Sequence, residues 1–427
     1  MNEHLNIGFI STRFAGTDGV SLETAKWAEV LKKMGHECRY FSGLCDRPKE
    51  ISMVVEDAFY KTTEIKVFHD AFFSKKTRTE EETQWILDKK NYLKIEIKKF
   101  VKEFSIDIFI IENALAIPLN IPLGWAITEY IVENGFPTIA HHHDFSWERK
   151  RFLVNCVDDY INMAFPPNVD FIQHVVINSH AQHQLARRRG TSSMIVPNVM
   201  NYSKPDGGAD EYNSDLRERL GIAPDELFIL QPTRIIERKG IEHAIELVHR
   251  LGKKAHLVIS HAAGDEGEDY SKRIDTYAEL LGVHLIKAEK FFEKERRITG
   301  EGQKIYSIRD GYIQSDLVTY PSEFEGFGNA FLEAIYFKKP IVVNNYSIFS
   351  TDIKPKGFKV IEFDEYITDQ TIANTLELLN DEELKNNYVN TNFELAKKYF
   401  SYEVLQTKLI ILLENAFGLE ARNGLAR

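Results

Sequence analysis

Apolar residues are spaced along the first fifty positions in a way that predicts a strand, a loop, a helix and a second strand. A short apolar run, NIGFIS (6–11), precedes the turn-rich loop TRFAGTDGVS (12–21). The next segment, LETAKWAEVLKKMG (22–35), has apolar residues at helical spacing, and HECRYFS (36–42) is typical of a strand. A strand, a helix and a strand in this order predict a parallel sheet with a right-handed crossover.

The same alternation continues over the next 150 positions. Further strands are expected at DIFIIEN (107–113), PTIAHHH (137–143) and HVVINS (174–179), with helical segments between them. Residues 80–104 are rich in Lys and Glu, which is typical of a solvated helix or a pair of helices. We therefore expect residues 1–200 to form one Rossmann-like α/β domain.

Near residue 200 the pattern changes. The segment VPNVMNYSKPDGGADEYNSD (196–215) is polar and contains two prolines and two adjacent glycines. Such a composition favours a connection over a packed element, and we expect residues 201–222 to be an interdomain linker. A second series of strands and helices follows, so that residues 223–398 are expected to form a second Rossmann-like α/β domain.

Composition narrows the classes of function. A length of 427 residues suits two domains, and a net charge of −11 disfavours nucleic acid as a partner, because phosphate backbones require a basic face. The three cysteines lack metal-like spacing, which indicates a reducing, cytoplasmic compartment. The least polar stretch, 108–132, is interrupted by Glu, Pro and Asn, so no transmembrane segment is expected. Peripheral membrane contact and the oligomeric state stay open.

The segment PSEFEGFGNAFLEA (321–334) places several polar and flexible residues at the junction of a strand and a helix. Two glycines, Gly326 and Gly328, let the backbone approach a ligand and expose amides at the positive end of the helix dipole. Glu325 on the loop and Glu333 on the helix can reach the same side, where one carboxylate would suit sugar hydroxyls and the other ribose hydroxyls. The alternative is that Glu325 caps the helix and Glu333 forms a surface ion pair.

A second cluster of charge lies in LQPTRIIERKG (230–240), where Arg234 and Lys239 follow a strand and precede a helix. An Arg fork, a Lys point charge and free helix amides together can hold a diphosphate. The alternative is that both residues are solvated in an exposed loop.

The spacing R-x4-K-G, followed downstream by PSEFEGFG-N-x-x-LEA, resembles the retaining glycosyltransferases of family 4, which have the GT-B fold. The resemblance is strongest over 227–345. It implies two Rossmann-like domains that face each other across a cleft, with a C-terminal helix (399–427) that crosses back to the N-terminal domain. It also implies that Arg234 and Lys239 bind and stabilise the donor diphosphate, while Glu325 contacts the transferred sugar near its anomeric carbon.

The remaining donor contacts implied by the resemblance come from the same turn and helix. Glu333 would hold the ribose, and the turn and the first helical residues would offer the donor their backbone, namely Gly326, Phe327, Gly328, Asn329 and Ala330.

In the first domain, similar enzymes place a glycine-rich loop over the donor phosphates and the acceptor, which would involve Gly16, Asp18 and Gly19 here. Asp18 would then lie on the acceptor side. The family usually has two adjacent glycines at this place, whereas this chain has GTDG, so the individual contacts stay open. Asp18 and Ser21 also fit the role of helix caps.

The run AHHHDFSWERKRF (140–152) lies at another predicted strand end. Neighbouring residues of an extended segment point to opposite faces, so three consecutive histidines make a poor chelating set, and we expect no metal site. A histidine at this strand end contacts the sugar or the acceptor in similar enzymes, which favours His143 as a catalytic and acceptor-binding residue, together with Asp144. A helix cap at Asp144 or Ser146 is the alternative.

Together these features predict a retaining glycosyltransferase without an essential metal or cofactor. Its substrates would be a nucleotide-diphosphate hexose, with GDP-mannose or UDP-glucose as leading candidates, and the hydroxyl of a small molecule or glycan. Attack from the face of the departing phosphate is favoured over a covalent route through Glu325. Two other functions are weighed against this one: a glycosyltransferase acting on nucleic-acid bases, and a non-catalytic nucleotide-sugar-binding protein. A phosphorylase-like enzyme is disfavoured because no lysine motif for a pyridoxal cofactor is evident.

Overall fold

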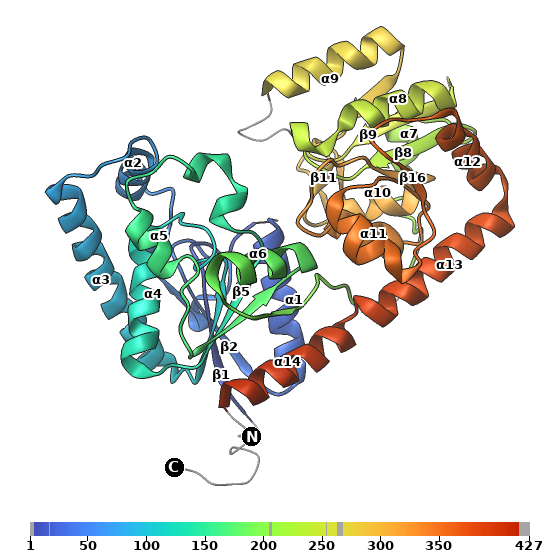
Figure 1. Ribbon diagram of the computed structural model, residues 1–427. Coiled ribbons are helices and arrows are strands. Elements are labelled where there is room, and N and C mark those ends of the chain that lie inside the picture. Colours follow the sequence, from blue (N-terminus) through green and yellow to red (C-terminus); the bar gives the residue numbers. More distant parts are fainter. Residues whose placement is uncertain (1–3, 17, 205–206, 253, 263–267, 418–427) are drawn as a thin grey trace. The chain divides into compact units, whose positions relative to one another are not determined.

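The computed structural model describes residues 4–16, 18–204, 207–252, 254–262 and 268–417 (Figure 1). The chain forms two compact units. Unit 1 extends to Val199 and resumes at Tyr402, and unit 2 comprises Met200–Ser401. Both are α/β units built on a parallel sheet, so the predicted pair of Rossmann-like domains is confirmed.

Unit 1 contains a seven-stranded parallel sheet with the strand order β3-β2-β1-β4-β5-β6-β7. The register sets Ile7 of β1 opposite Cys38 of β2 on one side and Ile108 of β4 on the other. The strands are β1 (Asn6–Ile10), β2 (Glu37–Ser42), β3 (Ser52–Val54), β4 (Ile108–Glu112), β5 (Thr138–His142), β6 (Ile172–Val176) and β7 (Ser193–Ile195).

The helices of unit 1 are α1 (Gly19–Lys33), α2 (Thr63–Phe72), α3 (Glu80–Phe104), α4 (Ile121–Asn134), α5 (Asp158–Ala164), α6 (Ser179–Arg189) and α14 (Tyr402–Phe417). The Lys- and Glu-rich segment is one continuous helix, α3, which begins with a capping box between Thr79 and Glu82. Such a box satisfies two backbone donors of the first turn and fixes where the helix starts.

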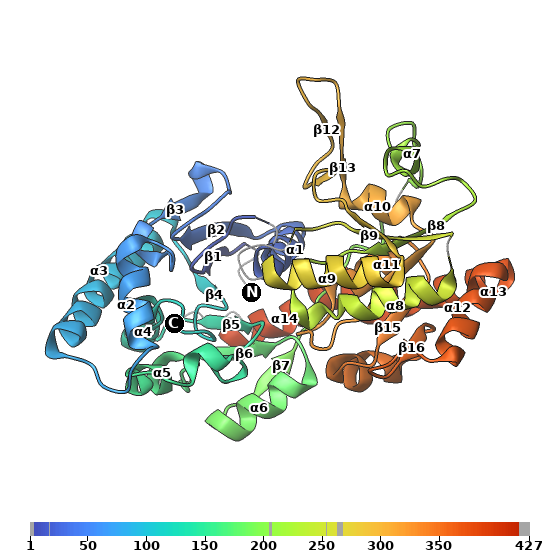
Figure 2. The same ribbon diagram turned by 90° about the horizontal axis from the view of Figure 1, so that it is seen from above.

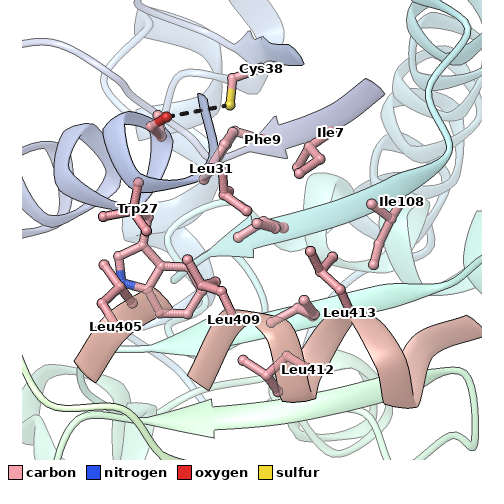
Figure 3. Close-up of a cluster of buried hydrophobic side chains, with 14 of the residues drawn as sticks. Ile7, Phe9, Trp27, Leu31, Cys38, Ile108, Leu405, Leu409, Leu412 and Leu413 are labelled. Atoms are coloured by element: carbon pink, nitrogen blue, oxygen red, sulfur yellow. Dashed lines mark hydrogen bonds between the residues drawn. The ribbon is translucent and has the colours of Figure 1, made fainter. Parts of the chain in front are cut away.

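Both faces of the unit 1 sheet are covered. Successive side chains of a strand point to opposite faces, so Ile7 and Phe9 join one buried cluster while Ile10 joins another. The first cluster includes leucines of α14, and Figure 3 shows Trp27 of α1 beside Leu405 and Leu409. The C-terminal helix α14 is therefore part of the core of unit 1.

Unit 2 contains a six-stranded sheet with the order β10-β9-β8-β14-β15-β16, in which every recorded strand pair is parallel. Its strands are β8 (Leu227–Gln231), β9 (Ala255–Ile259), β10 (His284–Lys287), β14 (Leu317–Tyr320), β15 (Ile341–Asn344) and β16 (Ile361–Phe363). A small three-stranded sheet, which sequence analysis did not foresee, consists of β11 (Phe292–Glu293), β13 (Lys304–Ser307) and β12 (Arg297–Ile298). Figure 2 shows its β12–β13 hairpin extending beyond the six-stranded sheet.

The helices of unit 2 are α7 (Leu216–Arg219), α8 (Ile241–Leu251), α9 (Glu268–Leu281), α10 (Ile308–Gln314), α11 (Asn329–Tyr336), α12 (Asp369–Asn380) and α13 (Glu382–Tyr399). Helix α8 places Ile241, Ile245 and Val248 in the buried cluster that also contains Ile229 of β8 and Leu257 of β9. This spacing is typical of a helix that buries one face against a sheet.

The segment 201–222 differs from the expected linker, because unit 2 includes it. Asn213 is fully buried and donates a hydrogen bond to Asp310 over 3.1 Å. Arg217 donates to Asp316 over 3.1 Å and also contacts the carbonyl of Glu226. These side-chain contacts tie a polar segment to the unit.

Among the residues that the structure describes, no helix combines the length and the apolar character that a membrane span requires.

Candidate active site

Two loops of unit 2 are brought together by the order of the strands. Strand β14 pairs directly with β8, so the loop that follows Gln231 and the loop that follows Tyr320 leave the same edge of the sheet. The loops touch at Gly240, which has a φ of +57° and whose Cβ, if present, would lie 2.5 Å from the carbonyl oxygen of Pro321. A side chain at Gly240 would force these loops apart, so glycine is required there.

The contact between the loops contains a buried ion pair. The Nζ atom of Lys239 contacts Oε1 of Glu325, and Nη1 of Arg238 lies 3.2 Å from Oε2 of the same carboxylate. Only 8% of Lys239 and 7% of Glu325 is exposed to solvent. Arg238 also donates to the carbonyl of Phe324 over 3.0 Å. Both oxygens of Glu325 are therefore engaged by cations.

The surroundings favour the charged form of Glu325. Burial raises the pKa of Glu325, but the charges of Lys239 and Arg238 outweigh burial and lower that pKa below its usual value. Burial lowers the pKa of Lys239, and the charge of Glu325 opposes this shift. The ring of Tyr320 lies 5.7 Å from the Lys239 ammonium group. A buried cation at the carboxyl end of a parallel sheet is the kind of group that stabilises a phosphate leaving group.

Arg234 lies in the same loop but is exposed, and Arg238 rather than Arg234 contacts Glu325. His261 follows the adjacent strand β9, and its pKa is lowered by burial first and then by the charges of Arg234 and Lys239. Arg234, Lys239 and His261 thus lie within electrostatic range of one another. Arg238 and His261 are not among the residues predicted from the sequence. Their positions at the ends of neighbouring strands were the signal that could have identified them.

In the turn before α11, glycine is required at position 328 by backbone conformation and by close packing inside the protein. Gly328 has a φ of +129°, and a Cβ there would lie 2.7 Å from Oη of Tyr346. That hydroxyl donates to the carbonyl of Phe327 over 2.8 Å. The side chain of Phe327 is buried and packs against Phe400 with ring centroids 5.3 Å apart, so only its backbone is placed to meet a ligand.

Helix α11 begins at Asn329 with Gly328 as its N-cap residue, and the cap makes no side-chain hydrogen bond. Glu325 is therefore not the helix cap, and that alternative is wrong. Gly326, Asn329 and Ala330 are half-buried around the helix start.

Glu333 lies on α11 and is half-buried. Its Oε2 atom accepts a hydrogen bond of 2.9 Å from the hydroxyl of Tyr312. Burial, followed by the charge of Glu333, raises the pKa of Tyr312 well above its usual value, so the tyrosine stays a donor. Glu333 is held by a buried tyrosine, whereas the alternative sequence interpretation was a surface ion pair.

In unit 1, the loop before α1 is organised around Asp18. Its carboxylate accepts from the backbone N–H of Ser21 over 3.3 Å and from the Ser21 hydroxyl over 2.8 Å, and Arg13 lies 2.8 Å away. Asp18 is thus the N-cap of α1. Gly16 is exposed with a φ of +84°, and its N–H donates to Asp46 over 3.0 Å. Gly19 is the exposed first residue of α1.

The histidine run ends strand β5 beside Glu112, the last residue of β4. Glu112 is paired with His141 in the register of the two strands. Its Oε2 atom lies 3.0 Å from Nδ1 of His141 and 3.2 Å from Nε2 of His143. Glu112 and His141 are almost completely buried, and 10% of the His143 side chain is exposed.

The pKa values of Glu112, His141 and His143 are shifted in different directions. Burial raises the pKa of Glu112, but the charge and hydrogen bonding of His141 and His143 outweigh it and lower that pKa to about 2. Burial lowers the pKa of His141. For His143, burial lowers the pKa, but the hydrogen bond and charge of Glu112 dominate and raise it. The arrangement therefore favours a charged His143 beside a charged Glu112 and a neutral His141.

Alternation of the histidines explains which of them meet. His142 points away and lies 2.8 Å from His174, as expected for the middle residue of an extended run. His141 and His143 share one face, and with Glu112 they offer three ligand atoms within 4.8 Å of one another, close enough to hold a metal ion. The argument from alternation thus excludes a set of three histidines, but not a set completed by Glu112. The absence of an essential metal stays a prediction.

Asp144 and His143 are both anchored by Asn113. The side-chain amide of Asn113 donates to Asp144 over 2.9 Å and accepts from the backbone N–H of His143 over 3.0 Å. Asp144 also pairs with Arg149. The N-cap residue of the following turn is Phe145, whose N–H donates to Glu148, so a cap at Asp144 or Ser146 is wrong.

Two parallel-sheet α/β units, with a cationic cluster at the strand ends of the second unit, define a glycosyltransferase of the GT-B fold. A family model described as glycosyl transferases group 1 matches residues 213–394, and the chain belongs to this family.

Two relatives in sequence carry the name mannosylglucosylglycerate synthase. The protein from Thermotoga maritima is 33% identical, and the match covers 94% of this chain and 98% of the relative. The protein from Petrotoga mobilis is 32% identical, over 84% of this chain and 86% of the relative. A solved glycosyltransferase from Rickettsia africae has a TM-score of 0.70 at 14% identity, covering 98% of this chain and 100% of that chain, which supports the fold.

Proposed function

We propose that this enzyme transfers mannose, with retention of anomeric configuration, from a nucleotide-diphosphate mannose to the hydroxyl of a glucosylglycerate. The observation that carries the proposal is the buried Lys239–Glu325 pair at the strand ends of unit 2, in a chain that aligns over nearly its whole length with a mannosylglucosylglycerate synthase. GDP-mannose is the donor proposed first and UDP-glucose the second. The acceptor follows from the chemistry that the relatives' name describes.

The proposed donor site lies in unit 2. Lys239 and Arg234 would bind the diphosphate, with Gly326, Phe327, Gly328, Asn329 and Ala330 contributing backbone contacts. Glu333, fixed by Tyr312, would accept hydrogen bonds from the ribose hydroxyls. As the bond between the anomeric carbon and the phosphate oxygen breaks, negative charge grows on the diphosphate. The Lys239 ammonium, held by Glu325, and the Arg234 guanidinium would stabilise that charge more than they stabilise the bound ground state.

The proposed route is attack by the acceptor hydroxyl from the face of the departing phosphate, with a phosphate oxygen taking the acceptor proton. A covalent route would need Glu325 as a free nucleophile. Its two carboxylate oxygens are instead engaged by Lys239 and Arg238, and ion pairing withdraws the electron density that a nucleophile needs. Glu325 is better suited to holding Lys239 in place and facing the positive anomeric centre.

On the acceptor side we propose His143 as the residue that touches the substrates, with Asp18 and Asp144 as further acceptor-binding residues. Gly16 and Gly19 would let the loop before α1 fit over the donor phosphates. No metal or other cofactor is proposed for the transfer. All three cysteines are free thiols, which fits a reducing compartment and supports a cytoplasmic location.

The test is transfer by the purified enzyme from GDP-mannose or UDP-glucose to glucosylglycerate, with the product's anomeric configuration read by proton NMR. We expect transfer from GDP-mannose, giving a mannosylated product whose configuration matches that of the donor; transfer from UDP-glucose alone would overturn mannose as the transferred sugar. An inverted product would overturn the retaining assignment, and absence of transfer with every donor would overturn the proposed substrates. Tight donor binding without turnover of any acceptor would favour the alternative of a non-catalytic sugar-nucleotide-binding protein.

A further inference from the structure

We propose that Glu112, His141 and His143 form a binding site for a divalent transition-metal ion such as Zn²⁺, and that the bound ion holds the ring of His143 in place. The site belongs to unit 1 alone and can be tested without any substrate. The positioning role rests on the proposed function, because it concerns the histidine assigned to the acceptor side. The ion takes part in no bond-making step of the transfer.

The spacing of the ligand atoms fits a four-coordinate ion. Oε2 of Glu112 lies 3.0 Å from Nδ1 of His141 and 3.2 Å from Nε2 of His143, and the three residues offer ligand atoms within 4.8 Å of one another. Nitrogen and oxygen ligands at the usual zinc distances of about 2.0–2.2 Å are about 3.3 Å apart in a tetrahedron. The two measured separations are close to this value.

Several buried polar atoms of the cluster lack a hydrogen-bond partner. Oε1 of Glu112 and both ring nitrogens of His141 are buried and make no hydrogen bond with any residue that the structure describes. The 3.0 Å contact between His141 and Glu112 is thus a close approach of two ligand atoms and not a hydrogen bond of good geometry. Buried polar groups are normally paired, and an ion bound to lone pairs of both residues accounts for the exception.

The ligands are held in position by the strands and by ring packing. Glu112 and His141 are opposite each other in the register of β4 and β5, and His143 returns to the same face two positions later. The His141 ring stacks on Trp27 of α1 with centroids 4.3 Å apart, and the backbone N–H of His143 donates to Asn113 over 3.0 Å. Ligands that are fixed beforehand lose little conformational freedom when they bind an ion.

The ligand types select the class of ion. Two imidazoles and one carboxylate suit Zn²⁺ and neighbouring transition ions, whereas Mg²⁺ and Ca²⁺ prefer a shell of oxygen atoms. The carboxylate of Glu112 supplies a buried negative charge that offsets the cost of burying a cation. The His143 side chain is 10% exposed, whereas those of Glu112 and His141 are almost completely buried, so the ion enters from the side of His143.

Coordination through Nε2 determines the tautomer of His143. The ion uses the lone pair of Nε2, so the proton of the neutral ring lies on Nδ1. Nδ1 then donates a hydrogen bond to an oxygen atom of the acceptor, from a ring that the ion ties to Glu112 and His141. We therefore expect the ion to improve binding of the acceptor and to leave the rate at saturation nearly unchanged.

The first experiment measures metal binding to the full chain. Protein stripped with EDTA and then freed of the chelator is titrated with Co²⁺, whose visible absorption distinguishes four-coordinate from six-coordinate sites. We expect one equivalent of four-coordinate Co²⁺, displaced by one equivalent of Zn²⁺ and not by excess Mg²⁺. Absence of saturable binding, a six-coordinate spectrum or displacement by Mg²⁺ would overturn the proposal whether or not the proposed substrates are correct.

Variants then locate the ion. Glu112→Gln and His143→Gln should each weaken Zn²⁺ binding by about 100-fold or more, because even outer partners of metal ligands contribute about 10–100-fold. His183→Gln, which removes an exposed histidine of α6, is the matched control and should bind Zn²⁺ as the wild type does. His143 is partly exposed, so its variant keeps the test decisive if Glu112→Gln fails to fold. Unchanged affinity in His143→Gln, or an equal loss in His183→Gln, would mean adventitious binding and would overturn the site.

The second experiment tests the positioning role by steady-state kinetics with varied glucosylglycerate. Removal of the ion should raise the Michaelis constant for this acceptor by about tenfold with little change in kcat, and stoichiometric Zn²⁺ should reverse the change in the wild type but not in His143→Gln. Inhibition by stoichiometric Zn²⁺ would mean that the ion blocks His143, and would overturn the positioning role. Absence of transfer to any acceptor would overturn the proposed function and this role with it, whereas the binding measurements decide the metal site independently.

Discussion

The ammonium group of Lys239 lies directly against the carboxylate of Glu325, and both groups are more than nine-tenths shielded from solvent. Removing one member of a buried pair leaves an uncompensated charge, which typically costs about 3–5 kcal/mol of stability. The pair therefore has two effects that must be separated in any mutational test: it holds two loops together, and it presents a cation to the donor diphosphate.

Lys239→Ala should lower turnover by about 10²–10³-fold, the usual effect of losing one fixed stabiliser of developing negative charge. Glu325→Gln should also lose turnover but keep most of its affinity for the free nucleotide diphosphate, because the diphosphate binds the cations and not the carboxylate. Turnover and calorimetric affinity should be measured together with melting temperature. Lys254→Ala, which removes an exposed surface pair, is the control and should match the wild type. Full turnover in Lys239→Ala would contradict the leaving-group role.

Gly328→Ala should destabilise unit 2 and weaken donor binding. The φ of +129° is unfavourable for any residue with a side chain, and the new Cβ would lie 2.7 Å from the Tyr346 hydroxyl. Strain of this kind costs about 1–3 kcal/mol. Gly300→Ala is the control, because nothing lies within 4 Å of its Cβ position and its φ is not positive. A thermal melt with and without nucleotide compares them, and equal stability of the two variants would contradict the assignment.

The central strands of both sheets could be predicted because their apolar runs are continuous and their connections carry clear turn residues. The edge strands β3, β7, β10 and β16 were not predicted, and neither were the three-stranded sheet and the packing of Asn213 and Arg217. Strand β12 is two exposed residues long, and the burial of Asn213 depends on Asp310, which is distant in the chain. Nothing in a polar segment with proline and glycine indicates that one of its asparagines is buried against another element.

The candidate site was predictable in its residue types but not in its pairings. The sequence places Lys239 and Glu325 at the ends of two strands, and only the strand order makes those ends neighbours. His143 could be selected from the sequence, but its partner Glu112 belongs to another strand, and the register of β4 and β5 determines that they meet. For Asp18, the sequence fits both an acceptor-binding residue and a helix cap, and the structure shows that its side chain caps α1.

Glu333→Gln should raise the Michaelis constant for the donor while changing kcat little, because ribose contacts are made equally in the ground state and the transition state. Tyr312→Phe should act in the same direction with a smaller effect, since it removes the hydrogen bond that orients Glu333, which is worth about 1 kcal/mol. Steady-state kinetics with varied donor would measure both. A loss of kcat without a change in Michaelis constant would place Glu333 near the reacting sugar instead.

The stability of unit 1 should fall as the solution is made acid, and Glu112 should account for part of the loss. Its pKa is about 2 in the folded protein against 4.5 as the ordinary value, so the folded state binds the proton less readily than the unfolded state. The resulting stabilisation is present above the unfolded pKa and is lost as pH falls from about 4.5 toward the folded pKa.

Glu112→Gln should therefore be less stable than the wild type near neutral pH and should lose less stability between pH 5 and pH 3, a range set by these pKa values. Urea unfolding across this pH range, followed by the fluorescence of Trp27 and the other tryptophans, would measure both proteins. Glu103→Gln, which alters an exposed carboxylate on α3, is the control for general acid effects. Parallel pH profiles for the wild type and Glu112→Gln would mean that folding does not lower the pKa of Glu112, and the account of the cluster around His143 would fail with it.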